Sequence, residues 1–445
     1  MIGRLALSTV RAHPSAYSAA AGVIGVGTAL LTSFAALAET GLAAPAHRGE
    51  SMTMLAAIMG GWSVAIVVFG IASTITLVVR QRGAELALLR AIGATPRQVR
   101  RMVLLETVTV ATPAMAVGVL PGIGLGAFLL TRMVDAGVVQ APVEFITTWR
   151  TVISGTAVTL VAAVAAAVIA GGRAAKIAPT LAMAESSSGT AQSVVSAPKL
   201  WFGLLFLLLG LGSGVGTLFM ADGPLLAAVA GPACVAVAIG LALLCPIVVG
   251  GLGRIAALTP NAVIRLAIRN LAARAAASST VVGPLAMLVG IATGTLYMQY
   301  TENGTPKTAG DDIGAQFAVA NYLVVAMIIA FCGIAVTNSL IAATWERRRE
   351  FAALRLNAST RDQVLGMIVT ESALAAGLAI LLGTVAAATT VIPYALVKTG
   401  SPVPHGSAVS YLVIIGGAAV IACVTTFSTT MRATRTRPAL VLATA

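Results

Sequence analysis

The residues best suited to chemistry occur in two charged segments that share one pattern. The first segment contains Arg82, Glu85, Leu89, Arg90, Gly93 and Thr95, and the second contains Arg347, Glu350, Leu354, Arg355 and Thr360. Apart from Gly93, each residue of the first segment recurs in the second at the spacing that separates Arg82 from Arg347, within a long ungapped match. We call this constant spacing the repeat offset. A match of this kind indicates an internal duplication. Two copies with Glu and Arg repeated in register are candidate docking elements for a symmetric partner.

Each charged segment predicts a short amphipathic helix followed by a turn. In the first copy the apolar side would consist of Leu86, Ala87 and Leu89, and the polar side of Arg82, Glu85 and Arg90. Thr95 and Thr360 suit the N-cap position of the helix that follows each turn. A solvated basic loop that only sets membrane topology is the alternative. The repetition of Glu and Arg in register favours docking.

Two carboxylates, Glu106 and Glu371, lie one or two turns into long apolar segments and are again separated by the repeat offset. An ionisable side chain at the edge of the hydrocarbon is a functional hypothesis by default, and the positive end of a helix dipole favours an acid there. We expect a structural or coupling role, in which each carboxylate bonds to the adjacent charged segment. Proton relay is the alternative.

No motif for catalysis or metal binding accompanies these residues. A phosphate-binding P-loop requires Gly before Lys, whereas the four lysines follow Ala175, Pro198, Pro306 and Val397. The three histidines, His13, His47 and His405, are far apart. We therefore expect no catalytic, cofactor-binding or metal-binding residues in this chain, which is not expected to be an enzyme.

The charged segments must be positioned by membrane-spanning helices. Only 10% of the 445 residues are charged and 58% are hydrophobic, whereas soluble domains carry about 25% charged residues. Runs of about 20 apolar residues are long enough to span a bilayer. Ten such runs occur, at about 16–38, 54–79, 103–130, 150–172, 200–220, 224–250, 279–299, 317–343, 365–396 and 408–430.

The distribution of basic residues predicts the orientation of these spans. With ten spans, 23 of the 28 Lys and Arg residues fall on the side of the two termini. Cytoplasmic loops carry such an excess, so both termini are expected in the cytoplasm. Anionic lipid headgroups of the bilayer, rather than nucleic acid, are the expected neighbours of these charges.

The predicted fold is an all-α polytopic membrane protein of two parallel four-helix repeats plus two linking helices. The expected divisions are a first repeat at 1–182, a cytoplasmic linker at 183–199, two linking spans at 200–250 and a second repeat at 251–445. The repeats are parallel because six spans precede the second one. Close helix packing is expected at Gly118, Gly122, Gly126 and Gly383, because small residues at spacings of four let helices approach.

The pattern Arg-x-x-Glu-x-Ala-x-Leu-Arg-Ala-Ile-Gly-Ala-Thr at 82–95 resembles the FtsX-like permease domain of MacB-type ABC transporters. The resemblance covers both repeats, and the linking spans match the ten-span layout. The second copy departs from the pattern at Leu356-Asn357-Ala358. Family members often carry a large extracytoplasmic domain, but the corresponding loops here, about 40–53 and 300–316, are too short to fold independently.

The resemblance implies a permease subunit in a bacterial cell membrane, driven by separate ABC-type ATP-binding subunits that bind ATP and Mg²⁺. Two coupling segments in one chain imply two copies of that subunit. The expected direction of transport is export. The expected substrate is hydrophobic or amphipathic, because no charged cluster inside the spans marks a hydrophilic path and the helix faces are apolar throughout. Two alternatives remain open: an ATP-independent secondary transporter that uses Glu106 and Glu371, and a signalling or mechanotransmission subunit that does not transport.

Overall fold

A computed structural model of the chain describes residues 14–137, 139, 142–175, 197–258, 260, 262–305, 312–347, 351–352, 356 and 360–435. The regular secondary structure of these residues is entirely helical, without strands. The all-α fold class expected from the sequence is therefore confirmed.

Ten of the described helices are long and apolar enough to cross a membrane. They are α2 (Pro14–Ala43), α3 (Ala46–Gln81), α5 (Pro96–Asp135), α6 (Trp149–Ala174), α8 (Ala197–Thr217), α9 (Pro224–Ile255), α11 (Ala275–Gly304), α12 (Asp312–Glu346), α14 (Arg361–Thr399) and α15 (Ala408–Arg435). Each coincides with one expected span, so the prediction of a polytopic membrane protein is confirmed. Only Ala44 and Pro45 separate α2 from α3.

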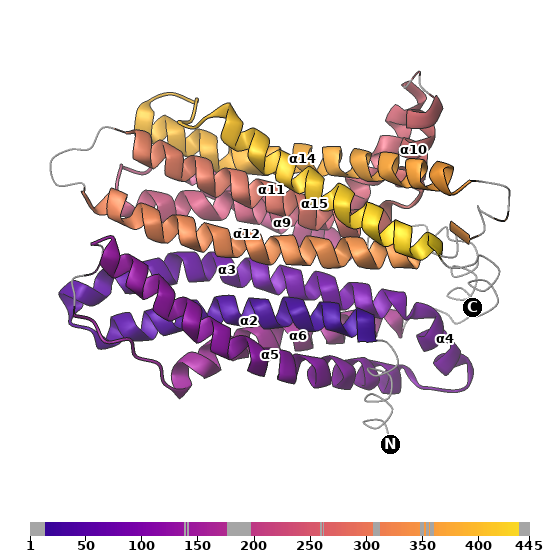
Figure 1. The fold of residues 1–445 in the computed structure, drawn as a ribbon, viewed down its shortest axis with the longest axis horizontal. Helices are drawn as coiled ribbons and strands as arrows, with labels where there is room; N and C mark the ends of the chain where they lie inside the picture. Colours follow the sequence, from indigo (N-terminus) through magenta and orange to yellow (C-terminus); the bar gives the residue numbers. More distant parts are fainter. Residues whose placement is uncertain are drawn as a thin grey trace.

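The spans form two groups that repeat the same order. The first repeat consists of α2, α3, α5 and α6, and the second of α11, α12, α14 and α15. Helices α5 and α14 begin at Pro96 and Arg361, which are separated by the repeat offset. Figure 1 shows the two groups as two layers whose long helices run along the same direction.

In each repeat the first and third spans approach closely at small residues. A Cβ atom on Gly118 of α5 would overlap the carbonyl oxygen of Gly25 in α2, and one on Gly122 would lie 2.7 Å from the Ala29 oxygen. At Gly126 the same hypothetical atom would lie 3.1 Å from the oxygen of Ser33. At Gly118 and Gly122, only glycine fits the contact without displacement of the helices.

The second repeat reproduces this contact at the equivalent glycine. A Cβ atom on Gly383 of α14 would lie 2.7 Å from the oxygen of Ala286 in α11. Gly118 and Gly383 are separated by the repeat offset, so the duplication has preserved the close approach of the two spans. The third span of each repeat is thereby held against the first.

The two repeats meet along α3 and α12. Phe331 of α12 is fully buried, and its ring fills the space left by Gly70 of α3 and Gly27 of α2. The side-chain amide of Asn338 donates a hydrogen bond to the Ala19 carbonyl oxygen over 3.0 Å. The contact between the repeats therefore combines apolar packing with a polar anchor in α2.

The linking spans pack as a hairpin against the second repeat. Helix α8 packs on α9, and α9 packs on α11 and α14. The Thr390 hydroxyl of α14 donates to the Ala230 carbonyl over 2.8 Å and accepts from the Cys234 amide over 2.8 Å. Thr390 thus pairs with backbone groups of α9 on either side of Pro232. Proline has no backbone N–H and interrupts the hydrogen bonds of a helix.

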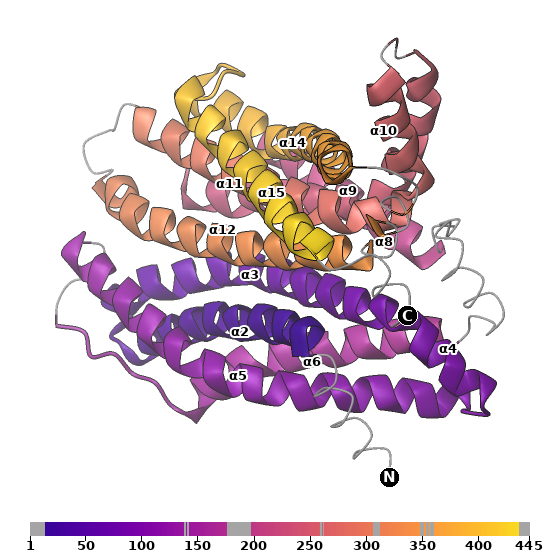
Figure 2. The ribbon, with the colours of Figure 1, turned by 45° about the vertical axis from the view of Figure 1, so that its right-hand side comes forward.

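Two shorter helices lie at one end of the bundle. Helix α4 (Gly83–Ala91) follows α3, and α10 (Ala262–Ala273) lies between α9 and α11, after the single-turn helix η1 (Ala256–Leu258). Figures 1 and 2 place α4 and α10 at the same end but on opposite sides of the bundle. This end carries the charged segments.

Candidate functional site

Helix α4 makes up most of the first charged segment. Arg82 ends α3 and begins α4, so the chain changes direction at this residue. Leu86 and Ala87 are buried, whereas Leu88 and Ile92 are 58% and 75% exposed. The helix therefore packs one apolar side on the bundle and presents two further apolar side chains outward.

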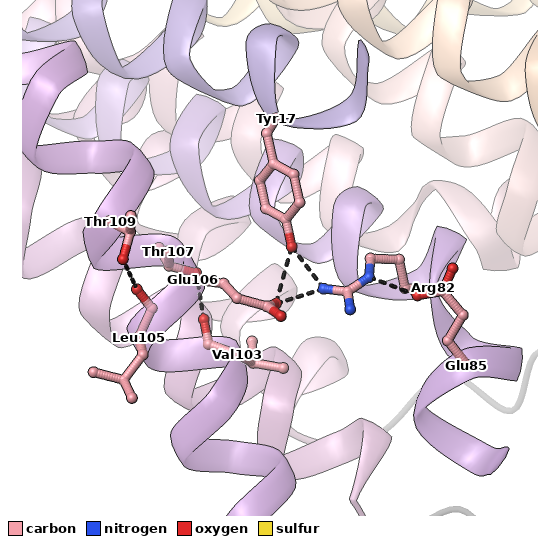
Figure 3. Close-up of polar contacts among 8 residues, drawn as sticks. All are labelled: Tyr17, Arg82, Glu85, Val103, Leu105, Glu106, Thr107 and Thr109. Carbon is pink, nitrogen blue, oxygen red and sulfur yellow. Dashed lines mark hydrogen bonds and ion pairs between the residues drawn. The ribbon is translucent and has the colours of Figure 1, made fainter. Parts of the chain in front are cut away.

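Arg82 is buried at the centre of a polar network that joins three helices. Its Nη1 atom lies 2.5 Å from Oε2 of Glu106 in α5 and donates to the Tyr17 hydroxyl of α2 over 2.6 Å. The Tyr17 hydroxyl donates to the same carboxylate oxygen over 2.9 Å, and Nε of Arg82 lies 3.0 Å from Oε2 of Glu85 (Figure 3). The network ties the start of α4 to both α2 and α5.

Burial makes this ion pair a strong constraint. The side chains of Arg82 and Glu106 are only 6% and 3% exposed. Loss of one partner would leave the other charge buried and uncompensated, which typically costs about 3–5 kcal/mol. Desolvation alone would lower the pKa of Arg82, but the charges and hydrogen bonds of Tyr17, Glu106 and Glu85 outweigh it and raise that pKa. Arg82 therefore remains charged.

The second repeat contains the equivalent pair. Nη1 of Arg347, at the end of α12, lies 2.6 Å from Oε2 of Glu371 in α14. The other carboxylate oxygen of Glu371 accepts from the Asn270 amide of α10 over 3.1 Å. Here the Arg347 side chain is 23% exposed, so the second pair is less shielded from solvent than the first.

The turn before each third span has the predicted cap. The Thr95 hydroxyl accepts from the Gln98 amide over 3.3 Å, and the Gln98 side chain accepts from the Thr95 amide over 2.8 Å. Thr360 and Gln363 form the same reciprocal pair at the start of α14. The N-cap predictions are confirmed. Gly93 has a φ of +107°, which a side chain would strain, so the first turn requires glycine.

The structure corrects the predicted polar face of the first segment. Arg82 does not lie on an outer face with Glu85 and Arg90, because it turns inward to the Glu106 carboxylate. Leu89 is partly buried against the main core, so it supports α4 rather than being fully presented outward. In the second segment, Glu350, Leu354 and Arg355 lie outside the described residues.

Two members of these networks were not expected from the sequence. Tyr17 and Asn270 complete the environments of Glu106 and Glu371, but they come from different elements, α2 and α10. Tyr17 and Asn270 are not separated by the repeat offset. A comparison of the two repeats therefore identifies the arginines and glutamates but not these two residues. Only the packing of the helices brings them to the carboxylates.

A second polar cluster, at the opposite end of the second repeat, was also missed. Lys398 in the last turn of α14 lies 2.6 Å from Oδ1 of Asp222 and 3.0 Å from Oε2 of Glu302, which also accepts from the Tyr394 hydroxyl. The positions of α5 that are equivalent to Tyr394 and Lys398 of α14 are Leu129 and Met133, which are apolar and buried. A comparison of the repeats for polar-to-apolar differences would have found the cluster.

These observations define a class of protein: a multi-pass membrane protein of two repeats, each with an Arg–Glu pair that joins the segment after its second span to its third span. The comparison with family profiles then identifies the family. The FtsX-like permease C-terminal domain matches residues 57–179 and 322–438, more than half of the chain. The chain belongs to the FtsX-like permease family.

The two matched segments begin at positions 57 and 322, which are separated by the same offset that relates the helices and the ion pairs. The predicted two-repeat permease is thereby confirmed. Proteins of this family are generally membrane subunits of ABC-type transporters, and their permease domains are membrane components rather than ATPases. The comparison with curated proteins found no match.

Proposed function

We propose that this chain is the permease subunit of an ATP-driven ABC transporter that docks one ATPase subunit on α4 and another on the equivalent segment after Arg347. The main support is the duplicated ion pair, Arg82 with Glu106 and Arg347 with Glu371. Two equivalent connections at one end of the molecule suit a partner that presents two equivalent surfaces.

The connections supply a path from the docking element to the membrane. A force on α4 acts on α3 through the chain and on α5 through the buried Arg82–Glu106 pair. Because α5 contacts α2 at Gly118, Gly122 and Gly126, these helices move as a packed unit. ATP-driven approach of the two ATPase subunits would therefore displace the long third spans, α5 and α14.

The outward side of α4 supplies the proposed contact surface. Leu88 and Ile92 are exposed apolar side chains next to the charged Glu85 and Arg90. An exposed apolar anchor with charges around it is typical of a protein interface. Glu106 and Glu371 are each paired with an arginine, which supports coupling rather than proton relay as their role.

The proposed orientation puts α4, α10 and both termini on the cytoplasmic side of a bacterial cell membrane. It is supported by the excess of basic residues on that side. The proposed cargo is hydrophobic or amphipathic, because each of the ten spans contains an 18-residue stretch with at most two charged residues, which offers no charged path to a hydrophilic cargo. Export is the proposed direction.

The docking surface is tested by co-purification of the chain with its candidate ATPase subunit. Ile92→Glu places a charge on the proposed contact and should lower both the amount of ATPase bound and its stimulation. Leu42→Glu is the matched control, because Leu42 is 79% exposed, like Ile92 at 75%, but lies at the opposite end of the bundle. If Ile92→Glu behaves like Leu42→Glu, the docking assignment is wrong.

A further inference from the structure

Helix α10 lies across the direction of the spans, beyond the end of α9. Figures 1 and 2 show it extending sideways from the bundle at the end where α4 lies, on the other side of the molecule from α4. A helix that crosses the spans where they end lies in the plane of the membrane surface. In the proposed orientation, this position lies among the headgroups and the upper acyl region of the cytoplasmic leaflet.

The two sides of α10 have the chemistry of an interfacial helix. Ala267 and Leu271 are buried against the protein, whereas Leu266 is 58% exposed. Arg269 is exposed and Arg265 is half-buried, on either side of Leu266 along the helix. An apolar side chain between two arginines allows insertion into the acyl boundary while the guanidinium groups remain among headgroups.

The charges along α10 and its flanks are entirely positive. Arg254, Arg265, Arg269 and Arg274 follow one another closely, and no Asp or Glu occurs between Asp222 and Glu302. Helix α4, by contrast, carries Glu85 with its arginines. A purely basic helix at a membrane surface complements anionic phospholipid, and the guanidinium group binds phosphate oxygens in a bidentate manner.

Helix α10 is also connected directly to the second ion pair. The Asn270 amide, on the side of α10 that faces the bundle, donates to Glu371, which pairs with Arg347. The position of α10 therefore determines whether Glu371 has two partners or one. No such helix connects to Glu106 in the described part of the first repeat, where Tyr17 of the spanning helix α2 takes this place.

We propose that α10 is a binding site for anionic phospholipid headgroups, in which Arg265 and Arg269 bind the phosphate groups, Leu266 enters the acyl boundary, and the bound lipid holds Asn270 on Glu371. The lipid site stands independently of the ATPase assignment. Its effect on coupling through Glu371 rests on the proposed function.

The lipid site is tested with a fluorophore on Leu266→Cys, in a chain with Cys423→Ser, because the other three cysteines are buried. The complex is reconstituted in nanodiscs of phosphatidylcholine, with or without phosphatidylglycerol, that contain a lipid spin-labelled near the headgroup. Leu88→Cys on α4 is the matched control, because Leu88 is also 58% exposed. We expect lipid quenching at position 266, stronger with phosphatidylglycerol, and shielding by the ATPase subunit only at position 88.

Shielding of position 266 by the ATPase, or no difference between the two lipid compositions, would overturn the proposal. If the ATPase fails to bind at all, the quenching at position 266 still decides it. The double variant Arg265→Gln/Arg269→Gln should weaken the association with phosphatidylglycerol by roughly fivefold per arginine. Arg97→Gln/Arg101→Gln, on the exposed first turns of α5, is the control and should leave the quenching at position 266 unchanged.

The connection to Glu371 is tested separately by Asn270→Ala. If the bound lipid acts through Asn270 and Glu371, phosphatidylglycerol should stimulate the ATPase activity of the wild-type complex. Asn270→Ala should retain the quenching at position 266 but lose this stimulation. If stimulation persists at the wild-type level, lipid binding does not act through Asn270, and that part of the proposal is wrong.

Discussion

Nη1 of Arg82 lies 2.5 Å from Oε2 of Glu106, and both side chains are almost completely buried at the end of the bundle. This pair joins the residue at which α3 becomes α4 to the third span, α5. Arg347 and Glu371 repeat the relationship in the second copy. The duplication has therefore preserved a connection between helices as well as a sequence pattern.

The first ion pair should be more important for stability than the second. Arg82→Met leaves Glu106 buried without its charge partner and should reduce the free energy of unfolding by about 3–5 kcal/mol. Arg347→Met should cost less, because Arg347 is more exposed than Arg82. Thermal unfolding of the purified variants in detergent compares the two losses of stability. An equal or larger loss in Arg347→Met would contradict the prediction.

The unpaired charge on Glu106, rather than lost packing alone, should account for the lower free energy of unfolding of Arg82→Met. Arg82→Met/Glu106→Met removes both charges and should recover part of the stability lost in the single variant, since apolar replacement of a whole buried pair is often tolerated. A double variant that is less stable than Arg82→Met would show that the side chains act mainly through packing.

The polar cluster around Lys398 should also lose stability when its cation alone is removed and regain it when its partners become apolar as well. Lys398→Met leaves Glu302 and Asp222 without their cation and should destabilise the protein. Addition of Glu302→Leu and Tyr394→Leu replaces two further polar members of the cluster by apolar side chains and should recover most of the loss. Thermal unfolding compares the two variants, and no recovery in the triple variant would indicate that the apolar replacements do not pack there.

The contact between α2 and α5 should not accept a side chain. Gly118→Ala introduces a Cβ atom that overlaps the Gly25 carbonyl and should separate the helices, with a loss of about 1–3 kcal/mol. Gly124→Ala on the same helix is the control, because no atom lies within 4 Å of its hypothetical Cβ. That variant should be neutral or slightly stabilising in thermal unfolding. Equal effects would argue against a close contact.

Much of the fold was predictable because its determinants are local or periodic. The ten spans follow from runs of apolar residues, and the repeats from the constant offset that relates Arg82 to Arg347 and Glu106 to Glu371. Thr95 and Thr360 were predictable as caps, because a capping box depends on residues only three positions apart. The division of the chain into 1–182, 183–199, 200–250 and 251–445 stays a prediction.

The rest of the site depends on tertiary packing. The amphipathic pattern of α4 assigns Arg82 to the polar face, but the nearby Glu106 carboxylate and Tyr17 hydroxyl draw it inward. Asn270 reaches Glu371 only because α10 lies beside the start of α14. Contacts of this kind join elements distant in sequence, so no local pattern encodes them.

The number of ATPase subunits bound per permease chain tests the central claim most directly. Mass measurement of the intact purified complex, by native mass spectrometry from detergent, determines this ratio. Two docking segments in one chain predict two ATPase subunits for each permease chain. A complex with one ATPase subunit for each permease chain would contradict the account, because one of the two Arg–Glu-linked segments would then have no partner.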